Sequence, residues 1–180
     1  MTHEPGTLTE RHGQYSLRRA QAADLDSLIE LLLELQDHIE ASNPDLWRMK
    51  REARHNLKGQ IGGRLKAAQS CALVAEHDED GVIGAIFGRI VVNNRYTPSR
   101  AGQIDQVFVR ADHRRAGIGS QLLTLLCGFF ASEGVEDITL RYVVGNEEAD
   151  GFWSALGFSP RIITAGARRE ALEDHLRERE

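Results

Sequence analysis

The stretch from Ile104 to Ala131 constrains the fold most, because it contains a strand, a loop and a helix in direct succession. Residues 104–110 have the β-branched and aromatic side chains of a strand, and residues 121–131 repeat apolar side chains at helical spacing. The loop between them carries Gly117 and Gly119. A strand that enters an amphipathic helix in this way is typical of a sheet covered by helices.

The remaining periodicities alternate between strand and helix. We expect further strands at residues 15–19, 71–77, 82–92, 138–144 and 162–164, and helices at about 24–39, 44–66 and 149–156. The Asp80-Gly81 turn would join the strands at 71–77 and 82–92 into a hairpin. This order predicts an α/β (α+β) fold, a mixed sheet with helices on both faces.

The same pass along the chain predicts its domain organisation. Residues 1–14 are polar and are expected to form a flexible N-terminal arm. Residues 15–166 would form a single domain, and residues 167–180 a charged C-terminal helix or tail.

Composition and charge exclude several classes of protein. The formal net charge is -5, without the basic excess of a nucleic-acid binder. No run approaches the ~18 consecutive apolar residues of a membrane span, and the N-terminus lacks the apolar segment of a signal peptide. Cys71 and Cys127 lie inside apolar runs, which favours buried free thiols in a reducing compartment. We therefore expect a cytoplasmic protein with no nucleic-acid partner and no membrane contact.

The loop before the helix at 121–131 has the features of an anion site. A helix N-terminus carries unpaired backbone N–H groups and about half a positive charge. Gly117 and Gly119 let the backbone approach a ligand closely, and Arg114 and Arg115 can add charge-assisted contacts. A pyrophosphate suits such a site, although an ordinary connection with two solvated arginines has the same pattern. The spacing matches neither a P-loop nor a dinucleotide-binding fingerprint.

Two motifs in this chain resemble the GNAT superfamily of acyl-CoA-dependent N-acetyltransferases. The segment Arg114-Arg115-Ala116-Gly117-Ile118-Gly119 matches the family pattern [QR]-x-x-G-x-[GA], and Val107-Phe108-Val109 precedes it as the family's strand does. The segment from Asn146 to Phe158 is similar to the family signature N-x-x-A-x-x-F-[YW]-x-x-x-G-F. The resemblance covers about residues 15–164 and implies a mostly antiparallel sheet with splayed central strands.

The resemblance implies a co-substrate, acetyl-CoA, and a role for each matching residue. The backbone of Val107, Phe108 and Val109 would hydrogen-bond the pantetheine arm and the thioester carbonyl, and Asn146 would contact the cofactor where the central strands diverge. The pyrophosphate would be held by the amides of Arg114, Arg115, Ala116, Gly117, Ile118, Gly119 and Ser120. The implied reaction is direct attack of a primary amine on the thioester in a ternary complex. The amine would belong to a small molecule or a peptide, and the resemblance is compatible with a homodimer.

The catalytic groups are less determined by the pattern. Asp105 occupies the position of a carboxylate that takes the amine proton in many relatives, but it also fits a polar residue at a strand edge. Trp153 stands where many relatives have a tyrosine that acts as general acid, and an indole cannot deliver that proton. Either another group protonates the thiolate or none is needed. Phe152 and Trp153 are interpreted as residues of the core.

Two weaker signals come from the histidines and from the charged segments. The histidines form no metal-ligand motif in the sequence, so no metal site is predicted and His113 is interpreted as a surface residue. The acidic segment 24–40 and the basic segment 44–66 suggest either two complementary solvated faces or an acidic attraction for a cationic amine. The acids that would provide this attraction are Glu34, Asp37 and Glu40.

One alternative to an enzyme with this mechanism stays open. A sensor or interaction module that binds CoA but has lost catalysis would have the same cofactor motif. The polar loop at residues 93–102, with Arg95 and Tyr96, could cover the acceptor site or be a solvated hairpin loop.

Overall fold

The computed structural model describes residues 9–43 and 48–179. The chain forms two compact units, Met1–Asn146 and Glu147–Glu180. The first contains the sheet and three α-helices, and the second contains two α-helices. The predicted division into an arm, a domain from 15 to 166 and a charged tail stays a prediction.

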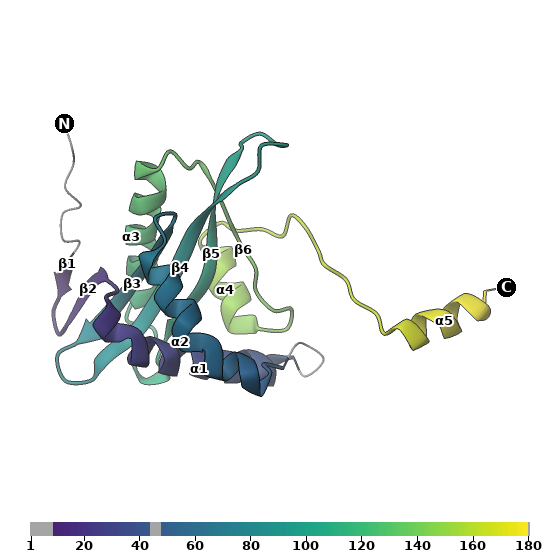
Figure 1. Cartoon of the computed structure of the whole chain (residues 1–180), viewed down its shortest axis with the longest axis horizontal. Coiled ribbons are helices and arrows are strands. Elements are labelled where there is room, and N and C mark those ends of the chain that lie inside the picture. Colours follow the sequence, from purple (N-terminus) through teal and green to yellow (C-terminus); the bar gives the residue numbers. More distant parts are fainter. Residues whose placement is uncertain (1–8, 44–47, 180) are drawn as a thin grey trace. The chain divides into compact units, whose positions relative to one another are not determined.

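A six-stranded open sheet forms the centre of the first unit (Figure 1). Its strands follow one another in the order of the sequence, and all neighbours are antiparallel except the last pair, which is parallel. The strands are β1 (Thr9–His12), β2 (Tyr15–Arg19), β3 (Ser70–His77), β4 (Gly81–Val92), β5 (Arg100–Val109) and β6 (Asp137–Leu140). This is the mixed, mostly antiparallel sheet that the sequence and the resemblance predicted.

Helices cover both faces of this sheet. The α1 helix (Leu25–Ser42) and the α2 helix (Arg51–Lys66) pack on one face, where Leu28, Ile61 and Phe87 belong to one buried apolar cluster. The α3 helix (Ile118–Ser132) contacts β3, β4 and β5 on the other face. The helix begins at Ile118, three residues earlier than the periodicity predicted, because Gly117 ends the loop in a left-handed conformation.

Two glycines let α3 approach the sheet closely. A Cβ on Gly88 would lie 2.7 Å from a methyl carbon of Leu126 and 2.9 Å from the Phe130 ring. A Cβ on Gly102 would lie 2.9 Å from the same ring. Phe130 is 1% exposed, so its ring fills the space that these glycines leave. Side chains on β4 and β5 at these positions would push the helix away from the sheet.

Four predicted boundaries differ from the structure. Thr9–His12, assigned to the flexible arm, form strand β1 against β2, while residues 1–8 lie outside the described part of the chain. The second helix begins at Arg51 and not near residue 44. Strand β6 ends at Leu140 although the alternation continues to residue 144. Residues 162–164 form no strand, and Ile162 and Ile163 are exposed, so no partner strand buries their side chains.

The second unit contains α4 (Glu147–Ala155) and α5 (Arg169–Arg177). Trp153 is 5% exposed and meets the rings of Phe152 and Phe158 edge-on, at centroid distances of 4.8 and 5.3 Å. The interpretation of Trp153 as a core residue is therefore confirmed.

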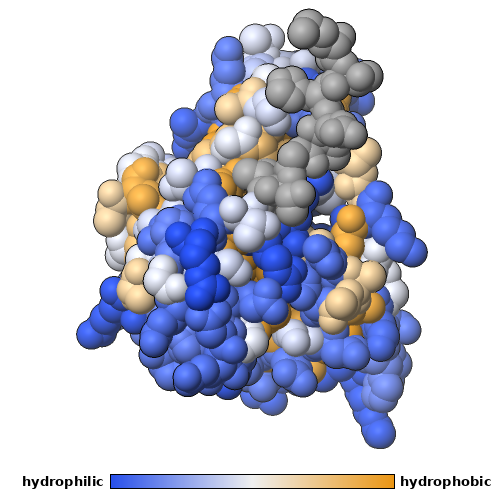
Figure 2. Space-filling model, turned by 90° about the vertical axis from the view of Figure 1, so that its left-hand side faces the viewer, coloured by the Kyte–Doolittle hydropathy of each residue, from blue (hydrophilic) through white to orange (hydrophobic). Residues whose placement is uncertain are grey.

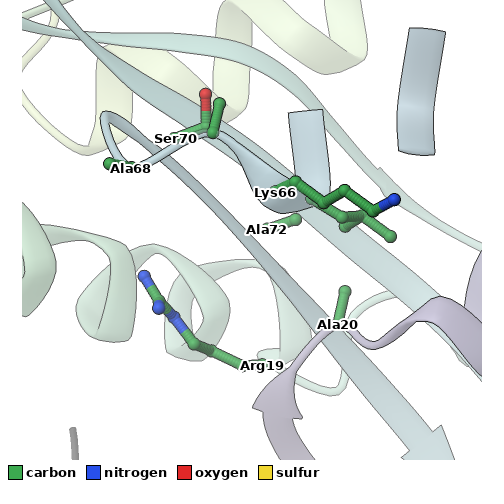
Figure 3. A pocket seen from close by; sticks show the side chains of 8 residues that line it. Arg19, Ala20, Lys66, Ala68, Ser70 and Ala72 are labelled. Carbon is green, nitrogen blue, oxygen red and sulfur yellow. The ribbon is translucent and has the colours of Figure 1, made fainter. Parts of the chain in front are cut away.

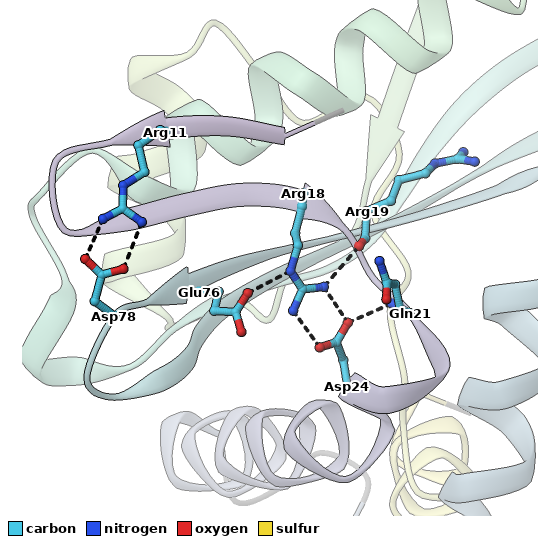
Figure 4. Close-up of polar contacts among 7 residues, drawn as sticks. All are labelled: Arg11, Arg18, Arg19, Gln21, Asp24, Glu76 and Asp78. Carbon is cyan, nitrogen blue, oxygen red and sulfur yellow. Dashed lines mark hydrogen bonds and ion pairs between the residues drawn. The ribbon is translucent and has the colours of Figure 1, made fainter. Parts of the chain in front are cut away.

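A buried ion pair fixes the start of α1 to the sheet (Figure 4). Both Nη atoms of Arg18 donate to the Asp24 carboxylate at 2.7 and 2.8 Å, and Arg18 Nε donates to Glu76 on β3 at 2.8 Å. The Gln21 N–H also donates to Asp24. These donors, of which Arg18 is the strongest, hold the pKa of the buried Asp24 carboxyl below its ordinary value.

Apolar side chains are concentrated inside the molecule. The face drawn in Figure 2 is mostly hydrophilic, with hydrophobic residues in small separate patches. Among the described residues, no helix has both the length and the apolar character required to cross a membrane.

The close approach of α3 predicts a large effect of a side chain at Gly88. Gly88→Val should lower the free energy of unfolding by about 1–3 kcal/mol, because its methyl groups would overlap with Leu126 and Phe130. Gly59→Ala is the matched control, since Gly59 lies in α2 with open space around it, and it should raise stability by about 0.5–1 kcal/mol. Urea unfolding measures both, and equal stability of Gly88→Val and wild type would contradict this packing.

The pair of Arg18 and Asp24 predicts a pH-dependent contribution to stability. Because folding lowers the Asp24 pKa, its contribution is complete above the unfolded value of about 3.9 and is lost as the pH falls through the lower folded value. Asp24→Asn should therefore cost roughly 2 kcal/mol at pH 7 and much less at pH 2–3. Asp78→Asn removes the exposed pair with Arg11, which solvent screens, and should change the free energy of unfolding little at either pH. Urea titrations of the three proteins at both pH values test this difference.

Candidate functional site

Strands β5 and β6 pair over only four residues. The parallel register runs from Ala101 opposite Asp137 to Ile104 opposite Leu140, while β5 continues to Val109. The pairing of β5 with β6 stops at a point where β5 contains one extra residue. Phe87 of β4 faces Gln106 of β5, but the next residue of β4, Gly88, faces Ile104. This β-bulge leaves Asp105 without a partner on β4 and bends the strand. The predicted divergence of the central strands therefore begins at Asp105.

The backbone of β5 beyond the bulge has polar groups that face away from β4. The Arg110 N–H donates to the Ile83 carbonyl, so Gly84 and Val109 form the next, non-hydrogen-bonded pair of the antiparallel ladder. By this alternation the N–H and C=O of Val109 and Val107 point to the side where β6 has stopped pairing. The predicted contribution of Phe108 differs, because its backbone faces β4 and its side chain is buried in the core.

The loop after β5 presents unpaired N–H groups at the start of α3. A short 3-10 helix, η2 (Ala111–His113), leads from β5 into the loop. Gly117 is the N-cap of α3 with φ +78°, and the first helical bond runs from the Gln121 N–H to the Gly117 carbonyl. Within the described part of the chain, the N–H groups of residues 117–120 have no acceptor. They are thus available to a ligand, and the helix dipole favours a negative one.

Two arginines, Arg114 and Arg115, lie in the loop just before α3. Arg114 Nε donates to the Val109 carbonyl at 3.0 Å, and its guanidinium lies over the Phe108 ring at 5.4 Å. Arg115 is exposed and has φ +64°, a left-handed conformation that costs a residue with a side chain of order 1 kcal/mol or more. Two left-handed residues, Arg115 and Gly117, turn the loop sharply before α3. The residues predicted to cradle a pyrophosphate therefore lie together at one helix N-terminus.

The bulge places Asp105 in a cationic environment. Its carboxylate accepts from Arg64 on α2, from Arg89 Nε at 3.2 Å and from the Gln103 side chain at 3.0 Å. The Asp105 side chain is 14% exposed. The predicted base thus lies beside the diverging strands, with hydrogen bonds from cations to both oxygens.

Arg64 is a residue of the site that the sequence analysis missed. It also donates to Gln106 at 2.7 Å, and its guanidinium lies 4.9 Å from the centre of the Phe87 ring. Burial lowers the pKa of this guanidinium from its ordinary value, although the charge of Asp105 opposes the shift. The excess of basic residues in segment 44–66 was the only signal in the sequence, and it did not distinguish Arg64 from its neighbours.

Asn146 lies after β6, where its N–H donates to the Val143 carbonyl at 3.1 Å. The structure places it at the end of the first unit, on the segment that follows the last paired residue of β6. Ala116 is exposed in the loop, and Ile118 is 2% exposed as the first residue of α3.

The acidic and basic helices complement each other. Arg54 binds Asp37 at 3.0 Å and Lys58 binds Asp26 at 2.9 Å. Glu40 accepts the Met49 N–H, and this bond lowers the pKa of the Glu40 carboxyl. The interpretation as two complementary solvated faces is confirmed by these pairs.

A hollow of about 200 Å³ lies at the opposite end of the sheet from the loop. Arg19 and Ala20 at the end of β2 line it, together with Lys66 at the end of α2 and Ser70 at the start of β3 (Figure 3). The loop adjoins the end of β5, which pairs with the start of β4. The hollow is therefore separate from the predicted cofactor site.

Comparison with known proteins gives the family. Residues 32–158 match the model of the acetyltransferase (GNAT) family. Among curated proteins, none matches the chain. A tetramutant of the BH1408 protein from Bacillus halodurans has a similar structure, with a TM-score of 0.74, 18% identity and coverage of 84% of this chain and 98% of that one.

Two similar structures are acetyltransferases by name. The aminoglycoside 6'-N-acetyltransferase from Acinetobacter baumannii has a TM-score of 0.67 at 16% identity, with 86% of this chain and 98% of that one covered. The ribosomal-protein-alanine N-acetyltransferase from Brucella melitensis has a TM-score of 0.62 at 17% identity, with 86% and 99% covered. At these identities the likeness shows a shared fold. With the match over residues 32–158, it leads to one conclusion: this chain belongs to the GNAT family of acetyltransferases.

Proposed function

We propose that the chain is an acetyl-CoA-dependent N-acetyltransferase that acetylates a primary amine of a small molecule or a peptide. One observation carries the proposal: the part of β5 that lacks a partner strand beside it leads directly to the unpaired N–H groups at the start of α3. A long ligand with an amide-containing arm and a pyrophosphate needs both features in this order. Membership of the family supports the same reading.

The backbone supplies most of the proposed binding. The N–H groups of residues 117–120 would hold the pyrophosphate, and Arg115 would add a charge-assisted contact. Val107 and Val109 would hydrogen-bond the amide-containing arm and the thioester carbonyl through their main chain. A main-chain N–H aimed at the carbonyl oxygen would also stabilise the negative charge that develops there, which is worth about 3 kcal/mol per donor.

The proposed reaction is a direct transfer. The neutral amine nitrogen forms a bond to the thioester carbonyl carbon, the carbon–sulfur bond breaks, and the amine proton passes to a base. Asp105 is the proposed base, and Arg89, whose side chain is 48% exposed, is the partner that could move aside to admit the amine. Trp153 supplies no proton, because an indole N–H is not acidic enough to protonate a thiolate. Its ring packs against Phe152 and Phe158. The thiolate of coenzyme A needs no acid from the protein, because it is already a fair leaving group near neutral pH.

Two features support the finer parts of the proposal. The named acetyltransferases with this fold act on an aminoglycoside and on a ribosomal-protein alanine, and both offer amines. Cys71 and Cys127 are free, and burial raises the pKa of both thiols, which suits a reducing cytoplasm.

Thiol release distinguishes the enzyme from a module that binds CoA without catalysis. We expect acetyl-CoA to yield free thiol only when an amine acceptor is added. A screen with amino acids, polyamines, aminoglycosides and peptides would identify the acceptor. Tight binding of coenzyme A without thiol release for any amine would favour the silent module.

The left-handed N-cap predicts the effect of a substitution at Gly117. Gly117→Asp should weaken coenzyme A binding roughly 100-fold, because it displaces two or more charge-assisted bonds worth about 1.5–3 kcal/mol each and adds a negative charge. Gly128→Ala is the control, since Gly128 is exposed on the same helix with open space around it. Titration calorimetry measures both, with circular dichroism to check the fold. Unchanged affinity in folded Gly117→Asp would refute the cradle.

Two variants separate a base at Asp105 from a structural carboxylate. If Asp105 takes the proton, Asp105→Asn should lower kcat by about 10²–10⁴ with little change in KM for acetyl-CoA. Arg64→Gln removes a partner of the same carboxylate, and its kcat should stay within about tenfold of wild type. Equal losses in both variants would show that Asp105 acts by holding the bulge.

A further inference from the structure

We propose that His77, Asp80 and His113 form a binding site for a divalent transition-metal ion such as Zn²⁺. The three residues come from separate elements: His77 ends β3, Asp80 lies in the turn before β4, and His113 ends η2. One ligand atom from each lies within 4.8 Å of the other two. The sequence analysis predicted no metal site, because spacing along the chain cannot show that His113 meets the turn.

The geometry leaves room for one ion. One carboxylate oxygen, Oδ2 of Asp80, lies 3.1 Å from Nδ1 of His77 and 3.1 Å from Nε2 of His113. Ligand atoms about 2.0–2.1 Å from a tetrahedral Zn²⁺ are roughly 3.4 Å apart. Small side-chain rotations would therefore bring all three atoms onto one metal.

The contacts of His77 favour a cation over a simple hydrogen bond. Its Nδ1 accepts the N–H groups of Glu79 and Asp80 at 3.3 Å each, so this nitrogen carries a lone pair. The same nitrogen faces a carboxylate oxygen, which is also an acceptor. Two acceptors at this distance repel each other unless a proton or a metal ion lies between them.

Protons alone would satisfy this cluster poorly. The two rings lie side by side, with centroids 5.1 Å apart. Nδ1 of His77 cannot accept the N–H groups of Glu79 and Asp80 and also donate a proton to the Asp80 carboxylate. A single divalent ion would bind one nitrogen of each ring together with the carboxylate oxygen. The histidine side chains are 12% and 18% exposed, whereas that of Asp80 is 49% exposed. A fourth position on the ion would therefore be open to water.

The donor set indicates the class of metal. Two imidazoles and one carboxylate suit Zn²⁺, Co²⁺, Ni²⁺ or Fe²⁺, whereas Mg²⁺ and Ca²⁺ prefer oxygen ligands. His113 immediately precedes Arg114, so the ion would join the β3–β4 turn to the residue that enters the proposed cofactor loop. Metal binding by these three residues does not depend on the proposed acetyl transfer.

Metal titration of the full untagged chain tests the proposal. After dialysis against a chelator, calorimetry with ZnCl₂ should show one ion bound per chain, and Co²⁺ should give a visible ligand-field absorption. His113→Ala and Asp80→Asn should weaken Zn²⁺ binding by about 100-fold or more, since removal of a ligand exceeds the 10–100-fold effect of residues that only support ligands. Zn²⁺ should raise the Tm of wild type but not of these variants.

Two controls complete the test. His55→Ala removes an exposed histidine on α2 and should leave the stoichiometry and affinity for Zn²⁺ unchanged. Mg²⁺ in place of Zn²⁺ should leave the wild-type Tm unchanged. Wild type that binds no Zn²⁺ at one equivalent, or binding that persists in the folded double variant His113→Ala with Asp80→Asn, would overturn the proposal.

Discussion

The end of pairing between β5 and β6 at Ile104 is the constraint on which the proposed site depends. A strand inside a sheet has its backbone polar groups bonded on both sides, so it can offer them to no ligand. In this chain the bulge at Asp105 bends β5, and from Val107 onward one side of the strand has no partner strand among the described residues. Unpaired backbone in the middle of a protein is costly unless a ligand or water satisfies it. The fold therefore keeps a binding surface where a regular sheet would have none.

Strand β5 leads through the loop to the start of α3, where backbone N–H groups also lack hydrogen-bond acceptors. The first N–H groups of α3 face the loop, and left-handed residues on both sides of Ala116 produce the turn that aims them. Arg114 joins the two surfaces, because its guanidinium bonds the Val109 carbonyl and lies over the Phe108 ring. Main-chain groups thus carry most of the recognition of an extended, anionic ligand. The position of α3, and so of its first N–H groups, depends on Gly88 and Gly102, which let the helix pack closely on the sheet.

Ion pairs position the elements around this surface. Arg18 connects β2, β3 and the start of α1, and Arg64 connects α2 to the bulge of β5. Both arginines are partly buried and each binds two polar side chains, so each costs desolvation that only good geometry offsets. They fix the register and orientation of helices whose apolar faces could slide on the sheet. Asp105 at the bulge accepts the hydrogen bond of Arg64, and its carboxylate is also the group proposed to take the amine proton.

The sequence by itself determined the strand, glycine loop and helix from residue 104 to 131, the hairpin at Asp80-Gly81 and the family. These are local features, because periodicity and the backbone freedom of glycine act over a few residues. Only the tertiary structure decided where β6 stops, that Arg64 meets Asp105 across 41 residues, and that His113 meets His77 and Asp80. The strand predicted at 162–164 failed for the same reason. Alternating apolar residues show that a segment can form a strand. Whether another strand pairs with it depends on the register and the bulges of the rest of the sheet.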